Sequence, residues 1–324
     1  MSHSSSDSSS PASLIQSILA RATSQSGPGL PALYPVEGGS VNSTYQVTTK
    51  DNRQWFSKIN DSRAFPDLLE KESRGLDLLR MQDIFRIPAV VARETARGRQ
   101  VLLLEWISQG PKTPAFWTLF GEQLARLHRV SAEFNQLQSQ PSQHQPGITA
   151  SSESNASGSF GLSWDNYMGA LPQSNTPTSR WTDFFIQQRL APQVRLAARN
   201  DLLDSGHIRS FERLYPLLPG IFPEEAPSLL HGDLWSGNFL CDEHSQPVLI
   251  DPAVYFGHRS MDMAMTTLFG GFDPGFYEAY TYHFPFPANY REQWEICNLY
   301  PLLIHLNLFG KSYQGSILHT IQRF

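Results

Sequence analysis

Residues 231–251 hold two carboxylates and one carboxamide that could act together on a phosphoryl group. Asp233 and Asn238 lie in the stretch His-Gly-Asp-Leu-Trp-Ser-Gly-Asn, and Asp251 ends the apolar run Val-Leu-Ile. The polar turn between them predicts a loop, a short strand, a turn and a second short strand, with a carboxylate at each end. In magnesium-dependent phosphoryl transfer, one Asp orients the attacking hydroxyl, and an Asn and a second Asp hold the metal. The order and spacing therefore predict Asp233 as the catalytic residue and Asn238 and Asp251 as magnesium ligands, although each motif alone is common in ordinary turns.

Lys58 is the one charged residue in the strand-like run Trp-Phe-Ser-Lys-Ile. Because successive side chains of a strand alternate between its faces, Lys58 shares a face with Phe56 and is expected to point inward. A lysine in that position can hold the phosphate oxygens of a nucleotide if a carboxylate fixes it. A helix expected at about residues 67–80 supplies four candidate carboxylates, Asp67, Glu70, Glu72 and Asp77. Glu72 is preferred, although helical periodicity alone does not select it over Glu70.

A hairpin with a flexible tip is expected at residues 34–47, where alternating side chains flank a Gly-Gly pair. The tip could cover the phosphates of a nucleotide, because glycines let backbone N–H groups approach an anion. The residues predicted to make these contacts are Gly38, Gly39, Ser40 and Asn42. The loop is not a Walker motif, since no Gly-Lys-Ser/Thr follows it, and a purely structural hairpin has the same pattern.

The apolar run at residues 101–107 fits a buried strand, and a Ser-Gln-Gly-Pro turn follows it. In a chain with two lobes, the end of this strand would form the hinge between them. The backbone of Glu105, Trp106 and Ile107 would then meet the adenine edge of a nucleotide. A central strand without that role has the same sequence.

Length and composition narrow the classes of protein that fit. The chain has 324 residues, 40% hydrophobic and 17% charged, which is typical of a soluble globular protein large enough for two lobes. A formal net charge of -5 without a long basic run argues against a primary role with nucleic acid or an anionic membrane. We expect no membrane span and no secretory signal, and we expect Cys241 and Cys297 to be reduced. Zinc is not indicated, because the chain has no cluster of Cys and His in sequence. A cytoplasmic enzyme is the expectation.

Composition also divides the chain into parts. Residues 1–12 are mostly small and polar and are expected to be disordered. Residues 13–107 are expected to form a small lobe with the phosphate loop and the hinge, and residues 108–324 a helical lobe with the catalytic loop. A helix expected at residues 113–130 leads into a stretch rich in Gln, Ser, Asn and Pro, residues 131–159, which we expect to be a flexible insertion.

Three further polar residues are expected to be structural. His128, near the end of the helix at 113–130, is expected to be a capping or packed residue. Asp262 could stabilise the backbone of the catalytic loop as a buried acceptor. His305 lies in a strongly apolar helical run and is expected to be a satisfied core histidine.

From about residue 13 onward, the chain resembles the fructosamine kinase (ketosamine-3-kinase) family, which is related to aminoglycoside and choline kinases. The parts described above are general to such kinases. The segments that look more specific to this family follow one another in the right order, at residues 160–169, 171–175, 181–190, 234–238, 255–259, 268–272 and 305–310.

The resemblance implies an α+β, protein-kinase-like fold with two lobes, a small one of mainly antiparallel β structure and a larger one that is mainly helical. It implies a kinase that uses ATP and Mg²⁺ to phosphorylate O3 of the sugar in ketosamines, the adducts formed by glycation. The 3-phosphate then decomposes spontaneously and frees the amine. The resemblance also selects Glu72, rather than Glu70, as the partner of Lys58.

Several points stay open. Ser260 stands where family members often carry an acidic residue, and the connection at residues 135–155 is longer than is usual. Trp235 and His231 are candidates for substrate contact, Trp235 either as a flat platform for the sugar or its linked amine or as a packed indole. A kinase of the aminoglycoside, choline or homoserine type and a nucleotide-binding pseudokinase are the alternatives. The residues do not decide the sugar length, whether the ketosamine is free or protein-bound, or the oligomeric state.

Overall fold

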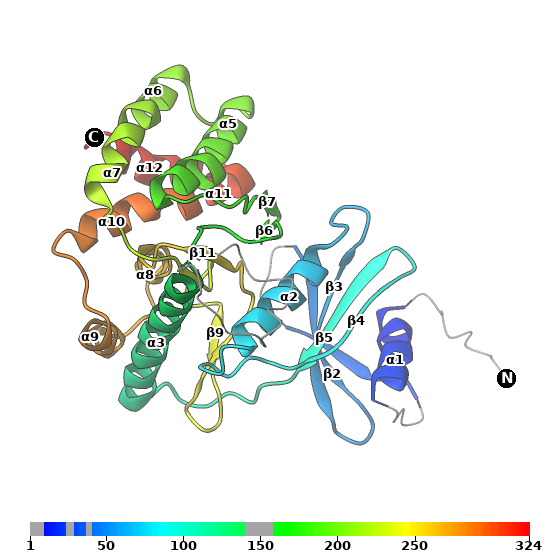
Figure 1. Ribbon diagram of the computed structural model, residues 1–324. Coiled ribbons are helices and arrows are strands. Elements are labelled where there is room, and N and C mark those ends of the chain that lie inside the picture. Colours follow the sequence, from blue (N-terminus) through cyan, green and yellow to red (C-terminus); the bar gives the residue numbers. More distant parts are fainter. Residues whose placement is uncertain (1–9, 24–28, 37–40, 140–157) are drawn as a thin grey trace.

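An antiparallel sheet of five strands, in the order β1-β2-β3-β5-β4, forms the N-terminal part of the computed structural model (Figure 1). The structure describes residues 10–23, 29–36, 41–139 and 158–324. The strands of this sheet are β1 Ala32–Pro35, β2 Ser43–Thr48, β3 Gln54–Asp61, β4 Val90–Ala96 and β5 Arg99–Glu105. β1 pairs with β2, so the predicted hairpin is confirmed on both sides of its tip. The tip residues Gly38, Gly39 and Ser40 lie outside the described residues.

Two helices, α1 (Pro11–Ala22) and α2 (Leu68–Arg80), cover the two faces of this sheet. β5 explains why both faces must be covered. Val101 and Leu103 pack in one apolar cluster with α1, while Leu102 and Leu104 belong to the second cluster, which includes α2. A strand that is buried on both faces reads as a continuous apolar run, which is why its sequence shows no alternation.

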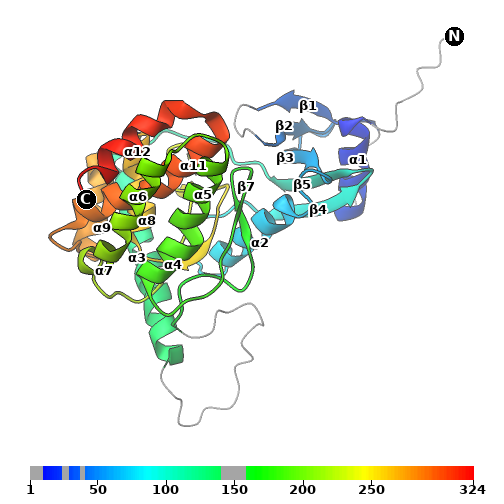
Figure 2. The ribbon, with the colours of Figure 1, turned by 90° about the horizontal axis from the view of Figure 1, so that it is seen from above.

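The rest of the chain is mainly helical and lies beside the sheet as a second lobe (Figure 2). Its long first helix, α3 (Pro114–Ser139), packs against α9 (Figure 1). The other elements with helical hydrogen bonding are α4 Trp181–Phe184, the π-helical segment η1 Phe185–Leu190, α5 Ala191–Arg199, α6 Ser205–Leu214, η2 Tyr215–Leu217, α7 Leu218–Ile221, α8 Ser260–Leu268, α9 Pro274–His283, α10 Tyr290–Cys297, α11 Leu299–Phe309, η3 Lys311–Tyr313 and α12 Gln314–Ile321.

Three small two-stranded antiparallel sheets lie in the helical lobe. β9 (Phe239–Cys241) pairs with β10 (Pro247–Leu249), which confirms the predicted strand, turn and strand between the catalytic motifs. β8 (Ser228–Leu230) pairs with β11 (Tyr255–Gly257) and so brackets the same region. β6 (Asn166–Met168) and β7 (Leu171–Gln173) form the third pair.

The structure moves three of the predicted boundaries. α1 begins at Pro11, inside the terminus expected to be disordered, because Ser10 caps the helix and accepts a hydrogen bond from the backbone N–H of Ser13. α3 continues to Ser139, so the first part of the expected insertion is helical, while residues 140–157 lie outside the described residues. β5 ends at Glu105, two residues before the predicted end of the strand.

Both cysteines are free and buried, Cys241 in β9 and Cys297 in α10, as expected for reduced thiols. Among the described residues, no helix combines the length and the apolar character that a membrane crossing needs.

Candidate active site

A cleft of about 380 Å³ lies where the sheet meets the helical lobe. Its lining comes from β3 and α2 of the N-terminal lobe, and from the β6–β7 hairpin, the two catalytic segments (residues 231–238 and 248–252), α11 and η3 of the helical lobe. Lys58, Glu72, Asp233, Asn238 and Asp251 all line it. The structure therefore brings together five side chains that come from four segments, which are β3, α2 and the two catalytic segments.

Lys58 lies at the centre of a buried group of charges. Its Nζ is 2.8 Å from a carboxylate oxygen of Glu72 and 2.5 Å from one of Asp251, and its side chain is almost fully buried. Lys58 thus points inward, as the alternation of β3 predicts. Glu70, the alternative partner, is exposed and pairs with Arg93 at 3.5 Å, so the choice of Glu72 is confirmed.

The charges in this group depend on one another. Burial alone would lower the pKa of Lys58, but the carboxylates of Asp251 and Glu72 raise it above its ordinary value. Burial raises the pKa of Glu72, against the opposing pull of the Lys58 charge. Lys58 is therefore held as a cation, and the removal of one partner would leave a charge unpaired in a dry environment.

Asp233 lines the same cleft and is held by Asn238. The Nδ2 of Asn238 donates to the carboxylate of Asp233 and to its backbone carbonyl, both at 2.9 Å. Burial raises the pKa of Asp233 to about 7, and the charges of Asp251 and Asp262 add to this, while the hydrogen bond from Asn238 lowers it. A carboxyl that titrates near neutrality can accept a proton and release it again, which is what a general base requires.

The two catalytic segments are tied to each other through their backbones. The Ala253 N–H donates to the His231 carbonyl at 2.9 Å, and the Ile250 N–H donates to the Asn238 carbonyl at 3.1 Å. Gly232 has φ +83°, and a Cβ there would lie 2.1 Å from the carbonyl oxygen of Ala253. The close approach of the two segments therefore requires glycine at this position.

His231 does not contact the cleft, which corrects the expectation that it could touch substrate. It is fully buried, and it is not among the described residues that line the cleft. Its Nε2 donates to the carbonyl of Ile250 at 2.8 Å, which leaves Nδ1 to accept from the backbone N–H of Asp233 at 3.3 Å. His231 therefore positions the loop, and burial lowers the pKa of its ring.

Asp262, near the start of α8, accepts hydrogen bonds from the backbone of the catalytic loop, as the sequence suggests. Its carboxylate accepts the backbone N–H groups of His231 and Gly232, both at 2.8 Å. His128 lies 3.3 Å from the same carboxylate and 2.8 Å from the hydroxyl of Tyr280. His128 is thus a packed, hydrogen-bonded residue that links the loop to the interior of the helical lobe.

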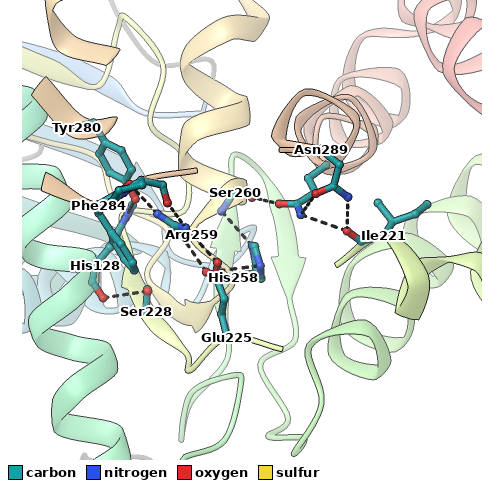
Figure 3. A network of polar contacts seen from close by, with 12 residues as sticks. His128, Ile221, Glu225, Ser228, His258, Arg259, Ser260, Tyr280, Phe284 and Asn289 are labelled. Atoms are coloured by element: carbon teal, nitrogen blue, oxygen red, sulfur yellow. Dashed lines mark hydrogen bonds and ion pairs between the residues drawn. The ribbon is translucent and has the colours of Figure 1, made fainter. Parts of the chain in front are cut away.

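A polar network continues from there through the helical lobe (Figure 3). Arg259 makes a bidentate contact with the carboxylate of Glu225, at 2.9 and 3.0 Å, and also donates to the carbonyl of Phe284 at 2.9 Å. His258 lies 3.6 Å from Glu225. Burial lowers the pKa of His258 to about 4, although the Glu225 charge opposes this shift. His258 is therefore held neutral in the interior.

Ser260 is buried and donates to Gln293 Oε1 at 2.8 Å. Gln293 in turn donates to the carbonyl of Ile221 at 3.1 Å (Figure 3). Ser260 and Gln293 thus join α8 to α10 and α7, and neither is among the described residues that line the cleft.

The predicted hinge residues lie at the rim of the sheet. Glu105 pairs with Arg86 at 2.7 Å, and Arg86 pairs with Asp242 at 2.5 Å, which ties the end of β5 to the turn after β9. Trp106 is half-buried and Ile107 is buried. None of the three hinge residues is among the described residues that line the cleft, so their contact with adenine stays a prediction.

Of the predicted phosphate loop, Asn42 is described and lines the cleft.

Trp235 also lines the cleft and is 37% exposed, so the interpretation as a flat platform fits better than that as a packed indole. The indole lies over Gly237, where a Cβ would be 2.3 Å from the ring.

Residues of α11 and η3 also line the cleft, and the sequence assigned them no role there. His305 was expected in the core, but it is half-buried and lies on the cleft, although its Nδ1 does donate to the carbonyl of Pro301 at 2.7 Å. Phe309 and Tyr313 lie beside it on the cleft. The sequence did hold a signal for this part of the cleft, because residues 305–310 are one of the segments that resemble the fructosamine kinase family. A helix that only packs in the core would not need such a resemblance.

Comparisons with known proteins agree with this geometry. The model of the fructosamine kinase family matches residues 14–324. A relative from Lactiplantibacillus plantarum, named as a ketoamine kinase, is 35% identical, and the alignment covers 90% of this chain and 93% of the relative. A protein-ribulosamine 3-kinase from Arabidopsis thaliana, described as chloroplastic, is 34% identical over 89% of this chain and 81% of its own.

Solved structures extend the comparison to the fold. A crystal structure named as a fructosamine-3-kinase, from Thermobifida fusca, has a TM-score of 0.78 and 32% identity, and covers 95% of this chain and 98% of its own. A macrolide 2'-phosphotransferase has a TM-score of 0.57 at 15% identity over 97% of both chains, which shows a shared fold alone. The two-lobed fold is therefore that of the protein-kinase-like phosphotransferases, and the chain belongs to the fructosamine kinase family.

Proposed function

We propose that this chain transfers the γ-phosphoryl group of ATP to O3 of the sugar in a ketosamine. The observation that carries the proposal is the meeting of Lys58, Glu72, Asp233, Asn238 and Asp251 in one cleft. This set has the parts that phosphoryl transfer needs, which are a positioned base, a cation for the phosphates and oxygen ligands for a metal. Relatives named as ketoamine and ribulosamine kinases supply the substrate class.

Asp233 is the residue we assign to the acceptor hydroxyl. Asp233 lines the cleft, and Asn238 donates one hydrogen bond to its carboxylate and one to its backbone carbonyl, which together fix its position. Asp233 orients the O3 hydroxyl and takes its proton as the O3–phosphorus bond forms and the bond between the γ-phosphorus and the bridging oxygen of ADP breaks. Catalysis on this account is mostly positioning and charge stabilisation.

Lys58 is the residue we assign to the nucleotide phosphates. Glu72 holds it from the side of α2, and Asp251 holds it from the catalytic side. A permanent cation in a buried position can exchange its contact with Asp251 for phosphate oxygens when the nucleotide binds. Asn42 lies on the same cleft, at the described edge of the phosphate loop. The adenine contact of Glu105, Trp106 and Ile107 belongs to the same proposal.

The residues present fit a magnesium ion. Magnesium prefers oxygen ligands and is usually held by one or two protein side chains together with substrate phosphates. The Nδ2 of Asn238 is engaged with Asp233, which directs its Oδ1 elsewhere, and Asp251 offers a carboxylate that is about one-third exposed. We assign the ion to these two residues, and its charge would offset that of the phosphates during transfer.

The two buried, free thiols fit a reducing compartment, and we retain the cytoplasm as the proposed location. The proposed partners are ATP and a ketosamine.

Phosphate transfer to a panel of acceptors tests the proposal. The panel contains ribulosamine- and fructosamine-modified lysine, choline and an aminoglycoside, each with ATP and magnesium. Transfer to the ketosamines with the phosphate on O3 is the expected result. Transfer only to choline or the aminoglycoside would keep the mechanism and reject the ketosamine. Nucleotide binding without transfer to any acceptor would identify a pseudokinase.

A further inference from the structure

We propose that the outer end of the cleft is a subsite for the amine substituent of the ketosamine, and that it selects alkyl and aryl substituents over small charged ones. The subsite is a cluster of five rings, called here the aromatic wall, formed by Trp235, Phe269, His305, Phe309 and Tyr313. This inference rests on the proposed function and names the part of the substrate that this surface would bind.

The rings of the aromatic wall form a continuous chain. Trp235 meets Phe269 edge to face, with their centroids 6.0 Å apart, and Phe269 meets His305 at 5.0 Å. His305 then contacts Phe309 at 5.5 Å and Tyr313 at 5.0 Å. This row of rings joins the catalytic segment to the end of α8, to α11 and to η3. Every ring except that of Phe269 lines the same cleft as Asp233.

The wall is exposed in a way that ordinary packing does not require. Eight large hydrophobic side chains are exposed among the described residues, and Trp235, Phe269 and Phe309 are three of them, at 37%, 41% and 52%. Single exposed rings are common on protein surfaces, whereas adjacent exposed rings that line a cleft mark a binding surface. The three rings are adjacent through His305, and Trp235 and Phe309 line the cleft that holds Asp233, while Phe269 packs against both Trp235 and His305.

The chemical character of this surface differs from that of the catalytic end. The residues that α11 and η3 contribute to the cleft are Ile304, His305, Leu308, Phe309 and Tyr313, and none carries a formal charge when His305 is neutral. Burial lowers the pKa of His305 and so favours the neutral ring, although the hydrogen bond from its Nδ1 to the carbonyl of Pro301 opposes this shift. The aromatic wall therefore offers ring faces, whereas the lysines that line the described part of the cleft, Lys58 and Lys71, belong to β3 and α2.

The geometry of a ketosamine brings its amine to this wall. The amine nitrogen is attached to C1 of the sugar, two carbons from C3, so a substrate with O3 at Asp233 carries its substituent a few bonds away. Trp235 follows Asp233 by two residues and begins the wall. The protonated amine can lie over a ring face, and the methylenes of a lysine-like chain can cover the exposed rings. A substituent that carries a carboxylate close to the nitrogen would lose hydration without gaining a partner.

Three ketosamines that share one sugar test the subsite, with hexylamine, methylamine and glycine as the amines. We expect kcat/KM of the unaltered chain to be about tenfold higher for hexylamine than for methylamine, with glycine lowest. The variant Phe309→Ala should lose about fivefold on hexylamine and less than about twofold on methylamine. Phe269→Ala should shift the preference in the same direction. Tyr282→Ala is the matched control, because Tyr282 is 84% exposed on α9 and does not line the cleft.

Equal kcat/KM for hexylamine and methylamine in the unaltered chain would overturn the subsite and leave the proposed function standing. So would an equal loss on both substrates in Phe309→Ala. Failure to phosphorylate any of the three ketosamines would overturn the proposed function, and the subsite with it.

Discussion

The two ends of the cleft are built on opposite principles. At the inner end, Lys58 is 3% exposed and contacts two carboxylates from different parts of the chain. At the outer end, Phe309 is 52% exposed and touches neighbouring rings of the aromatic wall. The inner end depends on fixed directions and paired charges, and the outer end on apolar area.

This difference predicts how each end responds to substitution. A charge that loses its partner in a buried site costs several kcal/mol, and a misplaced base loses orders of magnitude in rate. An exposed ring contributes binding in proportion to the area it covers, so its removal is felt as a modest factor. Changes at the inner end should therefore abolish turnover, whereas changes at the outer end should alter which substrate is preferred.

Asp233→Asn should have the largest effect. We expect kcat for any ketosamine to fall by about 10³- to 10⁴-fold, because the variant cannot accept the hydroxyl proton. Nucleotide binding should persist, since Lys58 and Glu72 are untouched. Without ligands, the melting temperature should equal or exceed that of the unaltered chain, because the variant no longer buries a carboxylate whose pKa burial raises to about 7. Steady-state kinetics, nucleotide titration and thermal melting check the three parts, and near-normal turnover would contradict the role of Asp233.

Lys58→Met should follow, with a loss of about 10²- to 10³-fold in kcat/KM, because a preorganised charge is removed from the phosphates. It should also destabilise the protein, since Glu72 is left buried without its cation. The double variant Lys58→Met, Glu72→Met should recover much of the melting temperature and none of the activity. Recovery of both would mean that the pair serves stability alone.

Gly237→Ala should have a smaller effect than Lys58→Met, because it displaces Trp235 and leaves the charged group around Lys58 in place. The added Cβ would lie 2.3 Å from the Trp235 ring, which is partly exposed and can swing away. We expect KM for the ketosamine to rise about tenfold with KM for ATP nearly unchanged, since Trp235 is displaced and Lys58 is not. Gly220→Ala is the matched control, because a Cβ at Gly220 meets nothing within 4 Å. An equal rise in both KM values would place Trp235 outside the acceptor side of the cleft.

His258→Gln should leave both ends of the cleft intact and change only the response to acid. The pKa of His258 is about 4 in the folded protein, below its ordinary value of 6.5, because burial disfavours the charged ring. The unfolded chain therefore takes up a proton between pH 6.5 and 4 that the folded chain does not, which destabilises the fold by up to about 3 kcal/mol as pH falls.

In His258→Gln this part of the acid destabilisation should be absent, although Glu225, whose pKa is lowered and which keeps its contact with Arg259, should retain some of it. Melting temperatures from pH 7 to pH 4 measure the difference. Parallel curves for the variant and the unaltered chain would show that His258 does not contribute, and kcat/KM at pH 7 should stay the same in both.

The sequence predicted the inner end far better than the outer end. Asp233 and Asp251 stand next to short strands, so their spacing indicated their chemistry, and the alternation of β3 indicated the direction of Lys58. Glu72 could not be separated from Glu70 by periodicity, because the position of α2 over the sheet decides which carboxylate meets Lys58. That position is a tertiary property, and only the family resemblance supplied it.

His231 and His305 show where local reasoning fails. His231 lies in the catalytic stretch, yet backbone bonds between two distant segments bury it. His305 lies in α11, whose residues are apolar on nearly every side, so the sequence shows no face that could mark the cleft. In both cases, the packing of segments that are remote in sequence decides whether the side chain meets solvent.

The contact between Lys58 and Asp251 joins residues 193 positions apart in the chain. Loop closure over such a distance carries a large entropic cost, and contacts of this kind form late in folding. A chain of this size also passes through partly folded states in which each lobe has structure of its own. Catalytic competence should therefore return only with the last step of refolding, after the helical signal has recovered. The recovery of activity during refolding would then measure the docking of the two lobes, because neither lobe holds the complete catalytic group by itself.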